Sequence, residues 1–585
     1  MECIDESYFN NLNEYQKKAV FTKNKYVLVI ASAGTGKTRV LVGRYLYLLK
    51  EVNYNQIIAL TFTNKAAKEM INRIDIKGSL FVGTFHSICL RLLREYANIS
   101  PTIIDDDDMK KILEKLEYSE NLVTSIKHIQ DNYISIDDIN DKNHISIKEA
   151  YIKYNKELEK NNLMDFNTII LKTIDILKNP SIGDKIRERF KYVLVDEYQD
   201  TSTSQENLLI ELTKEKTSLF AVGDDDQSIY HWRGANIQNI LTFQDRYPNS
   251  EIIELQNNYR STNEILDFAK AVINSNDDRY KKQISGIKNG NKVQIYSVPT
   301  NRQEPAIIAS QIQEIILKGN YSYKDIGILA RSNQTLRFIE QELNINSIPY
   351  RLFSGIKFFD RQEIKTIISY FRLILNNNDW LAFEKVISSP RRGIGLKTLE
   401  ILKKKEYLFE NLEGILSKKQ QEEMEKLENL LFKWKKDLKI MDLSSFLFRV
   451  LEESGLKDFF KEKHQINNLK ELSVVLSTFK NLQEFIDTFY FIIDEKENNS
   501  NYVSLMTLHM AKGLEFPIVI LPAWSEGYLP HPKSVEEGNI SEETRLAYVG
   551  VTRAKDHLYI YFYNNNPSRF LRKCAPYADI FMYNN

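Results

Sequence analysis

The stretch YVLVIASAGTGKTRVLVGRYLYLL, residues 26–49, decides the fold of this chain. It opens with a short apolar run at 26–30, passes through a loop with two glycines, and continues with apolar residues at helical spacing. This order predicts a strand, a glycine-rich loop and a helix. The same order follows from 57–60, where Asn64 is predicted to cap the next helix. Alternating strands and helices imply a parallel sheet, so the predicted fold class is α/β.

The loop from Ala31 to Thr38 has the composition of a phosphate-binding loop. Its glycines allow backbone N–H groups to wrap phosphate oxygens, Lys37 can reach the β- and γ-phosphates, and Thr38 can offer a hydroxyl to Mg²⁺. The first position of the usual pattern is Ala31 rather than glycine. Taken alone, the loop predicts a nucleotide site, with a plain glycine-rich turn before a helix as the alternative.

Further strands of the same kind are predicted at 192–195, 219–222 and 252–255, and each ends in polar residues. In open α/β sheets, ligands bind at the edge formed by the carboxyl ends of the strands. Between about 98 and 185 the pattern becomes helical, which predicts an insertion carried by the first α/β domain. The run Asp105 to Asp108 inside it predicts a solvated helix start.

A second α/β unit is predicted from about residue 276, with strands at 293–298 and 326–329. Its remaining strands come much later in the chain, at 503–508, 518–521 and 557–562. The residues between, near 371–496, are therefore predicted to form a second insertion. It looks helical because apolar residues lie at helical spacing, namely Met424, Leu427, Leu431, Trp434 and Leu438.

Composition excludes several classes of protein. Hydrophobic residues make up 43% of the 585 residues and charged residues 27%, so neither a disordered chain nor a membrane protein fits. The acidic N-terminus lacks the features of a secretory signal, which predicts a cytoplasmic protein without a membrane partner. Cys3, Cys89 and Cys574 are scattered, so no structural metal cluster is expected. Basic and acidic residues balance at 79 each, so any nucleic-acid surface must be local.

Two acidic residues follow the strand predicted at 192–195. Asp196 stands where a carboxylate would hold Mg²⁺, and Glu197 stands where a carboxylate would polarise an attacking water. An isolated Asp-Glu pair carries little information. After a strand and downstream of a phosphate loop, the pair predicts hydrolysis of the bound nucleotide.

The segment GDDDQSIYHWRG, residues 223–234, joins two kinds of chemistry. Gln227 follows a strand on the same sheet edge and can touch the γ-phosphate. Tyr230 and Trp232, only a few residues further on, can stack on nucleic-acid bases. For Trp232 the alternative is an ordinary core position.

Two arginines can neutralise charge that develops on a transferred phosphoryl group. Arg260 lies in NNYRS and Arg553 in VTRA, within the second α/β unit. If Arg553 serves the same nucleotide, the site lies in a cleft between two domains that hydrolysis would open and close. Surface arginines are the alternative for both.

The sequence resembles the UvrD/PcrA/Rep family of superfamily 1 DNA helicases. The matching motifs cover nearly the whole chain and follow one another in the order expected for that family. Leu12, Asn13 and Gln16 resemble the adenine-reading segment of that family. The other matching motifs are TFTNKAAKEM (61–70), GTFHS (83–87), MDFN (164–167), VDEYQDTS (195–202), GDDDQSIYHWRGA (223–235), NNYRS (257–261), FFDRQEIK (358–365), PRRGIG (390–395), TLHMAKGLEF (507–516) and EETRLAYVGVTRA (542–554).

The resemblance implies two RecA-like parallel-sheet P-loop NTPase domains, each carrying a mainly helical insertion. The first domain is expected at 1–97 and 186–275, with its insertion at 98–185. The second is expected at 276–370 and 497–585, with a compact insertion at 371–496.

The resemblance also assigns residues to ligands. Around ATP it places Gln16, Ala33, Gly34, Thr35, Gly36, Lys37, Thr38, Arg39, Glu197, Gln227, Tyr259, Arg260, Glu515 and Arg553, with Thr38 and Asp196 at Mg²⁺. Along DNA it places Thr61, Phe62, Thr84, His86, Tyr230, Trp232, His509, Arg392, Gly393 and Gly395. His86 and His509 could equally be core or hinge histidines. In the loop at 390–395, backbone N–H groups would approach duplex phosphates.

The implied function is ATP-dependent DNA unwinding with 3′ to 5′ movement on single-stranded DNA, at single-strand/duplex junctions, in repair or replication. The alternative is an ATP-gated DNA translocase or sensor subunit that works with a separate nuclease in repair or anti-phage defence. The compact second insertion and the short C-terminus favour that alternative. A helicase–nuclease fusion is disfavoured, because the sequence offers no nuclease constellation and the charge run at 494–496 is better interpreted as solvated.

Overall fold

The computed structural model describes residues 6–76, 78–139, 145–353, 361–403, 408–410, 412–477, 479–488 and 501–583. They divide into two compact units. The first unit contains Met1–Thr84, Asn179–Gly355 and Lys496–Asn585, and the second contains Phe85–Lys178 and Ile356–Glu495. Parts of two predictions lie outside the described residues: the start of the motif at 358–365 and the charge run at 494–496.

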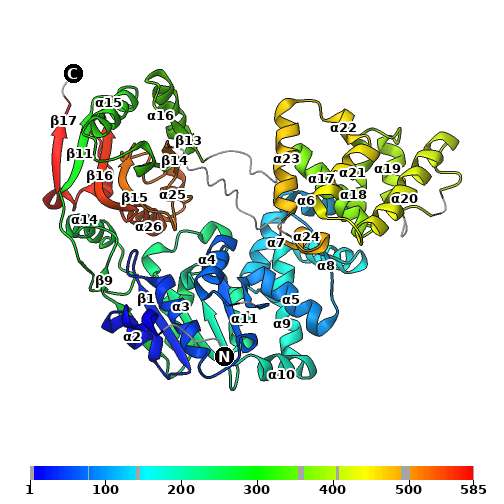
Figure 1. The fold of residues 1–585 in the computed structure, drawn as a ribbon, viewed down its shortest axis with the longest axis horizontal. Helices are drawn as coiled ribbons and strands as arrows, with labels where there is room; N and C mark the ends of the chain where they lie inside the picture. Colours follow the sequence, from blue (N-terminus) through cyan, green and yellow to red (C-terminus); the bar gives the residue numbers. More distant parts are fainter. Residues whose placement is uncertain are drawn as a thin grey trace. The chain divides into compact units, whose positions relative to one another are not determined.

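The first unit holds a parallel sheet in the order β3-β2-β6-β7-β1-β8. Figure 1 labels its strand β1. Its central strands are apolar and buried, as expected for a sheet covered on both faces. The strands are β1 (Tyr26–Ala31), β2 (Ile57–Thr61), β3 (Phe81–Thr84), β6 (Tyr192–Val195), β7 (Ser218–Gly223) and β8 (Glu251–Leu255). The accompanying helices are α1 (Ser7–Asn10), α2 (Glu14–Phe21), α3 (Lys37–Leu48), α4 (Asn64–Ile74), α10 (Pro180–Arg189), α11 (Thr203–Leu212), α12 (Gln238–Leu241), α13 (Phe243–Arg246) and α14 (Asn263–Ile273).

A second parallel sheet in the same unit has the order β13-β14-β12-β15-β16-β11-β17. It unites segments that are far apart in the sequence, because β11 and β12 precede the second insertion and β14 to β17 follow it. Its strands are β11 (Val293–Val298), β12 (Ile326–Ala330), β13 (Tyr350–Leu352), β14 (Val503–Thr507), β15 (Phe516–Leu521), β16 (Ala554–Tyr563) and β17 (Ala578–Met582). The helices are α15 (Glu304–Leu317), α16 (Asn333–Ile345), α25 (Pro532–Glu536) and α26 (Ile540–Val551), and a short pair, β9 (Asn257–Asn258) and β10 (Ser285–Gly286), links the two α/β parts.

The predicted α/β fold class and each predicted strand are confirmed, with strand ends that differ by a few residues. Three strands of the two large parallel sheets had no prediction: β3, β13 and β17. The predicted cap of α4 was wrong by one residue, since the side chain of Thr63 accepts a hydrogen bond from the N–H of Ala66, and Asn64 is already helical. The division into two units does not correspond to the four-part division at 98, 186, 276 and 371, which stays a prediction.

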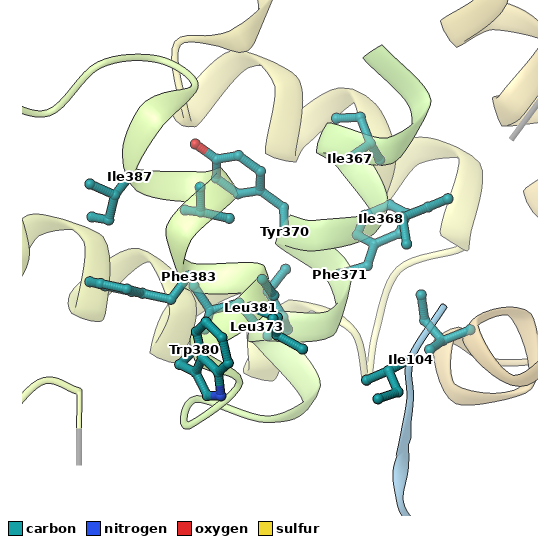
Figure 2. Packing of buried hydrophobic residues seen from close by; sticks show 14 of the residues in the cluster. Ile104, Ile367, Ile368, Tyr370, Phe371, Leu373, Trp380, Leu381, Phe383 and Ile387 are labelled. Atoms are coloured by element: carbon teal, nitrogen blue, oxygen red, sulfur yellow. The ribbon is translucent and has the colours of Figure 1, made fainter. Parts of the chain in front are cut away.

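The second unit is helical, and it contains most residues of both predicted insertions. Its short parallel pair is β4 (Thr102–Ile103) with β5 (Leu163–Met164). The helices are α5 (Phe85–Ala97), α6 (Asp106–Lys115), α7 (Leu122–Asp131), α8 (Ile145–Lys160), α9 (Phe166–Lys178), α17 (Gln362–Leu375), α18 (Trp380–Ser388), α19 (Leu396–Lys403), α20 (Lys418–Asp437), α21 (Leu443–Glu453), α22 (Leu456–Phe459), α23 (Lys463–Leu476) and α24 (Leu482–Thr488). One hydrophobic cluster contains residues of both insertions, and Figure 2 draws Ile104 in it with Phe371 and Trp380.

The acidic run at the start of α6 is only partly solvated. Asp105 caps the helix, as a helix start requires, by accepting a hydrogen bond from the N–H of Asp108. Asp108 itself is 8% exposed, and its carboxylate accepts a hydrogen bond from Arg372 at 2.6 Å. Arg372 also binds Asp379 at 2.8 Å. The prediction of a solvated run was therefore wrong for Asp108, because an arginine 264 residues away supplies its counter-charge.

Among the described residues, no helix combines the length and the apolar character that crossing a bilayer requires.

Glu304 makes the stability of the first unit depend on pH. It is the first residue of α15 and is 3% exposed, and its carboxylate accepts a hydrogen bond from the N–H of Ala523 at 2.9 Å. Burial raises the pKa of Glu304 to about 8. Between the ordinary carboxyl pKa of 4.5 and this value, the unfolded chain releases a proton that the folded chain keeps, so stability falls as pH rises through this window.

We expect Glu304→Gln to remove this decline. Relative to wild type, its free energy of unfolding should improve by roughly 2 kcal/mol between pH 5 and pH 9, because the neutral amide has no charge to bury. Urea unfolding at both pH values measures this difference. Glu314→Gln on the exposed side of the same helix is the control and should shift little. A Glu304→Gln difference that is independent of pH would contradict the prediction.

Candidate nucleotide site and nucleic-acid interface

The glycine-rich loop connects β1 to α3 and bends through two left-handed glycines, Gly34 at φ +76° and Gly36 at φ +92°. Two residues that follow β8, the strand next to β1, hold its carbonyl groups. Asn258 donates its side-chain amide to the carbonyl of Ala33 at 2.5 Å, and the N–H of Tyr259 donates to the carbonyl of Gly34 at 2.9 Å. Gly36 caps α3 without a side chain, which leaves the first N–H groups of the helix available to an anion.

The predicted adenine-reading residues lie beside this loop. Asn13 and Gln16 form a capping box at the start of α2, and the Gln16 amide donates to the carbonyl of Thr35 at 3.1 Å. Asn13 also donates to the hydroxyl of Tyr259 at 2.7 Å. The structure therefore brings Gln16 and Tyr259 to the same side of the loop, and the Tyr259 ring stays 41% exposed. Arg39 follows on α3.

Asp196 and Glu197 follow β6 beside the loop lysine, with 3.9 Å between Lys37 Nζ and Glu197 Oε2. Burial, with a smaller contribution from the charge of Glu197, raises the pKa of Asp196. Burial would also raise the pKa of Glu197, but Lys37, Lys512 and the hydrogen bond from Gln199 together hold that pKa below its ordinary value. Glu197 is therefore the member of the pair that keeps its charge most readily.

The donor set near Asp196 suits Mg²⁺ only in part. Among the described residues, no group of three or more His, Cys, Asp or Glu side chains is arranged to hold a metal. A hydroxyl from Thr38 and a carboxylate from Asp196 are oxygen ligands of the kind Mg²⁺ prefers, and this ion usually completes its shell with phosphate oxygens and water. The site therefore fits an ion that arrives with a nucleotide.

Residues of the second sheet complete the site. Arg553 is 1% exposed, and its guanidinium donates to the side-chain oxygen of Gln227 at 3.2 Å. Arg260 donates to Glu515 at 2.7 Å and to the carbonyl of Thr552 at 3.2 Å. Burial and the neighbouring Arg260 lower the pKa of Arg553 to about 9. The predicted residues of both sheets thus meet around one place.

Two residues without a predicted role stand inside this constellation. Lys512 donates to Asp200 at 2.5 Å and to the carbonyl of Gln227 at 2.7 Å, and its ammonium lies 4.9 Å from the centre of the Tyr230 ring. Gln199 donates to the carboxylate of Glu197 at 2.6 Å. Both residues lie inside motifs that match the family. For Lys512, the sequence feature that could have indicated a role is a lysine between apolar residues.

Phe62, Tyr230, Trp232 and His509 form a row of rings, which we call the aromatic row. Phe62 and Tyr230 stack at 5.2 Å between centroids, and Tyr230 meets Trp232 edge-on at 6.4 Å. Trp232 lies 6.4 Å from His509. Trp232 is 62% exposed, so it is not a core residue, and the alternative for this position was wrong. Burial, together with Arg331, lowers the pKa of His509 to about 4, which leaves the ring neutral at pH 7.

The remaining DNA-facing predictions fall in both units. Thr61 and Thr84 end neighbouring strands in register, 1% and 4% exposed. His86 belongs to the second unit, where it meets Phe166 edge-on at 5.7 Å and burial lowers its pKa to about 4.

The loop at 390–395 also lies in the second unit. The Arg392 guanidinium turns to the hydroxyl of Tyr370 at 3.1 Å. Gly393 and Gly395 are exposed, and a side chain at either position would meet nothing within 4 Å. The structure therefore leaves the backbone of this loop open at both glycines and turns Arg392 inward.

A phosphate loop on one parallel sheet, with an arginine from a second sheet reaching the same place, defines a P-loop NTPase of the helicase type. The sequence matches the UvrD/REP helicase N-terminal domain over residues 12–248 and the UvrD-like helicase C-terminal domain over residues 253–565. It is 35% identical to the ATP-dependent DNA helicase PcrA of Staphylococcus epidermidis and 33% identical to that of Staphylococcus aureus, over 96% of this chain and 86% of each relative. The chain belongs to the UvrD/REP helicase family, as its motifs predicted, and it is an ATPase of that family.

The loop geometry generates a prediction for Gly34→Ala. A Cβ atom there would stand 2.6 Å from the Cβ of Arg260 and 2.8 Å from the side-chain amide of Asn258, at a φ of +76°. We expect ATP affinity to fall at least tenfold, because Asn258 and Arg260 must move away from the loop. Titration with a fluorescent ATP analogue measures the affinity.

Gly319→Ala is the matched control, because Gly319 has the same φ of +76° and nothing within 4 Å of its added Cβ. It carries the backbone strain, worth about 1–3 kcal/mol, without the collision. Equal ATP affinity in the two variants would show that contact with Asn258 and Arg260 does not shape the loop.

Proposed function

We propose that this protein is an ATP-driven DNA helicase that moves 3′ to 5′ along single-stranded DNA and separates duplex strands at single-strand/duplex junctions. The observation that carries the proposal is the short segment from Gln227 to Trp232. At one end Gln227 accepts a hydrogen bond from Arg553, and five residues later Trp232 stands 62% exposed in the aromatic row. A short loop therefore connects the nucleotide site to a surface on which bases can stack.

In this proposal the protein binds both the adenosine part and the phosphates of ATP. Gln16 and Tyr259 bind the adenine, and Glu515 touches the ribose. The glycine loop and Lys37 bind the phosphates, while Thr38 and Asp196 hold Mg²⁺, which supplies charge neutralisation when bound. Glu197 polarises the attacking water. The γ-phosphate is contacted by Gln227, Arg260 and Arg553.

On the DNA side, bases stack on the aromatic row, with Thr61, Thr84, His86 and His509 near the backbone. Lys512 connects this surface to the nucleotide site, since it contacts both the Tyr230 ring and the carbonyl of Gln227. The exposed backbone at Gly393 and Gly395 is available to duplex phosphates. The polarity and a role in repair or replication rest on the family resemblance. ATP-dependent action on DNA is also supported by the relatives, which are named ATP-dependent DNA helicases.

A second candidate is an ATP-gated translocase or sensor subunit that works with a separate nuclease in repair or anti-phage defence. The compact second insertion favours it, since fewer residues are available to engage a duplex. This candidate keeps the same nucleotide site and the same aromatic row. It differs only in needing a partner for strand separation.

Strand displacement on 3′-tailed, 5′-tailed and blunt duplexes tests the proposal. We expect ATP-dependent displacement of the 3′-tailed duplex alone. Glu197→Gln should bind ATP normally and hydrolyse it orders of magnitude more slowly, because an amide keeps the shape but cannot polarise water as a carboxylate does. It serves as the catalytic control. Preference for the 5′-tailed duplex would overturn the polarity, and DNA-stimulated turnover without displacement would favour the second candidate.

Trp232→Ala tests the coupling between the two surfaces. Stacking is worth roughly 1–3 kcal/mol per base, so single-strand affinity should fall by about one to two decades. At saturating DNA, the rate of unwinding should fall further than the rate of ATP turnover. The variant still hydrolyses ATP, but it holds the single strand too weakly to separate the duplex in each cycle. The melting temperature should stay near that of wild type, since the side chain is 62% exposed.

Phe338→Ala, at an aromatic residue that is 54% exposed on α16, is the control for removal of a surface ring. It should leave both activities unchanged. An unchanged ratio of unwinding to ATP turnover in Trp232→Ala, together with lower thermal stability, would contradict a stacking role.

A further inference from the structure

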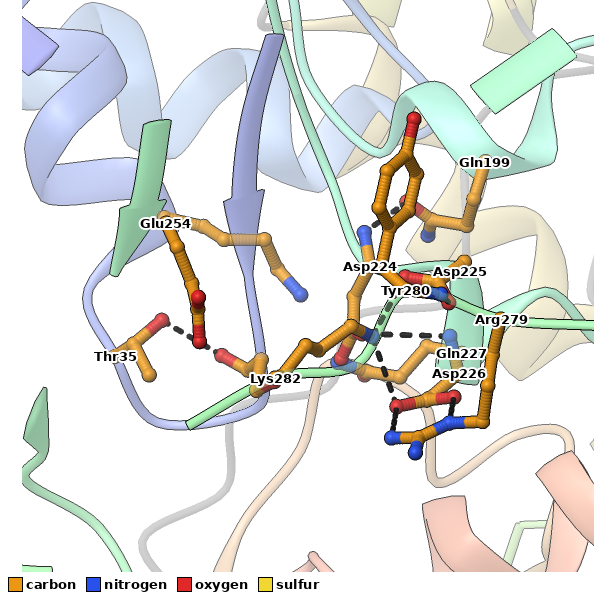
Figure 3. Close-up of polar contacts among 12 residues, drawn as sticks. Thr35, Gln199, Asp224, Asp225, Asp226, Gln227, Glu254, Arg279, Tyr280 and Lys282 are labelled. Atoms are coloured by element: carbon orange, nitrogen blue, oxygen red, sulfur yellow. Dashed lines mark hydrogen bonds and ion pairs between the residues drawn. The ribbon is translucent and has the colours of Figure 1, made fainter. Parts of the chain in front are cut away.

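Three consecutive carboxylates are buried directly after β7. Asp224, Asp225 and Asp226 are 0%, 0% and 1% exposed. The ammonium of Lys282 contacts all three, at 2.6 Å from Asp225 and 2.8 Å from Asp226, and it also donates to Asp224 Oδ1 (Figure 3). The Lys282 side chain is itself 1% exposed. Four charged side chains therefore share one enclosed place.

Lys282 stands on the segment that carries the chain from the first sheet to the second, between α14 and β11. Two neighbours on this segment bind the same carboxylates. Arg279 donates twice to Asp226, at 2.7 and 2.6 Å, and the N–H of Tyr280 donates to Asp225 at 2.9 Å. The connecting segment thus holds the acidic turn through several independent bonds.

Asp224 in turn forms hydrogen bonds with two residues of the nucleotide site. Its Oδ2 accepts a hydrogen bond from the Gln227 amide at 2.6 Å, which leaves the amide oxygen of Gln227 to accept from Arg553. Its N–H donates to the side-chain oxygen of Gln199 at 2.9 Å, and the amide of Gln199 then donates to Glu197 at 2.6 Å. The position of Asp224 therefore sets the orientation of both Gln227 and Glu197.

Packing alone gives no reason for such a cluster. Replacing a buried ion cluster by apolar side chains of similar volume is often neutral or stabilising, because burial of charge costs desolvation. A contact that fixes the direction of Asp224, by contrast, needs a cation at one defined point. The observed bonds satisfy that need.

We propose that Lys282 is a positioning residue for ATP hydrolysis, which holds Asp224 and thereby aligns Gln227 and Glu197. The inference rests on the proposed function of the nucleotide site and adds to it. Because Lys282 belongs to the segment between the two sheets, the alignment of Gln227 and Glu197 depends on where that segment lies. Nucleotide turnover is then sensitive to a movement that leaves the phosphate loop itself in place.

The test separates positioning from simple charge balance. Lys282→Met leaves the carboxylates short of one cation and should lower both the melting temperature and ATP turnover. The double variant Lys282→Met/Asp225→Asn removes one negative charge in compensation, at a carboxylate that bonds neither Gln227 nor Gln199 among the described residues. Asp225→Asn alone and Lys281→Met, at the exposed neighbouring lysine, are the controls.

We expect the double variant to regain its melting temperature while its kcat for ATP stays at least tenfold below wild type, with KM for ATP and single-strand affinity within twofold. A purely structural role predicts that melting temperature and kcat recover together, and that result would overturn the positioning role. Wild-type turnover in the same series distinguishes the two proposals. Absence of wild-type turnover overturns the proposed function and the positioning role with it, whereas normal wild-type turnover beside an equally active double variant overturns the positioning role alone.

Discussion

The hydrogen bond from Arg553 to Gln227 is the interaction on which the rest of the nucleotide site depends. Gln227 follows a strand of the first sheet, and Arg553 precedes a strand of the second, so the bond forms only when the two sheets are aligned. Both residues are buried, at 3% and 1% exposed. A buried guanidinium without acceptors would be costly, which makes Gln227 part of what permits Arg553 to be there. Arg260 with Glu515 makes a parallel link between the same two parts.

Buried pairs of opposite charge organise the charged side chains of the candidate site. Basic and acidic residues balance at 79 each, so no long-range field attracts nucleotide or nucleic acid. Instead, cations are concentrated at one place and held there by carboxylates, as Lys512 is held by Asp200 and Lys282 by three aspartates. Burial increases the strength of each pair, because the local dielectric is low. These buried pairs hold the side chains of the candidate site in fixed positions.

The sequence was sufficient where local chemistry decides the structure. Apolar runs that end in polar residues predicted the central strands, and glycines next to Lys37 predicted the loop. The strand β3 was missed because its two apolar residues lead directly into a glycine and a threonine, which is too short for a pattern. The cluster at Lys282 was missed for another reason. Its contacts join residues 56 and 58 positions apart, and nothing in the local sequence distinguishes a buried lysine from the exposed one beside it.

The same reasoning accounts for the helical unit. Asp108 belongs to the first insertion and Asp379 to the second, and Arg372 stands buried between them at 2.6 and 2.8 Å. The hydrophobic cluster around this ion group also takes side chains from both insertions. Removal of either insertion would therefore expose apolar surface of the other and leave a buried charge without its partner. The two insertions are consequently one compact unit, although residues 179–355 lie between them in the chain.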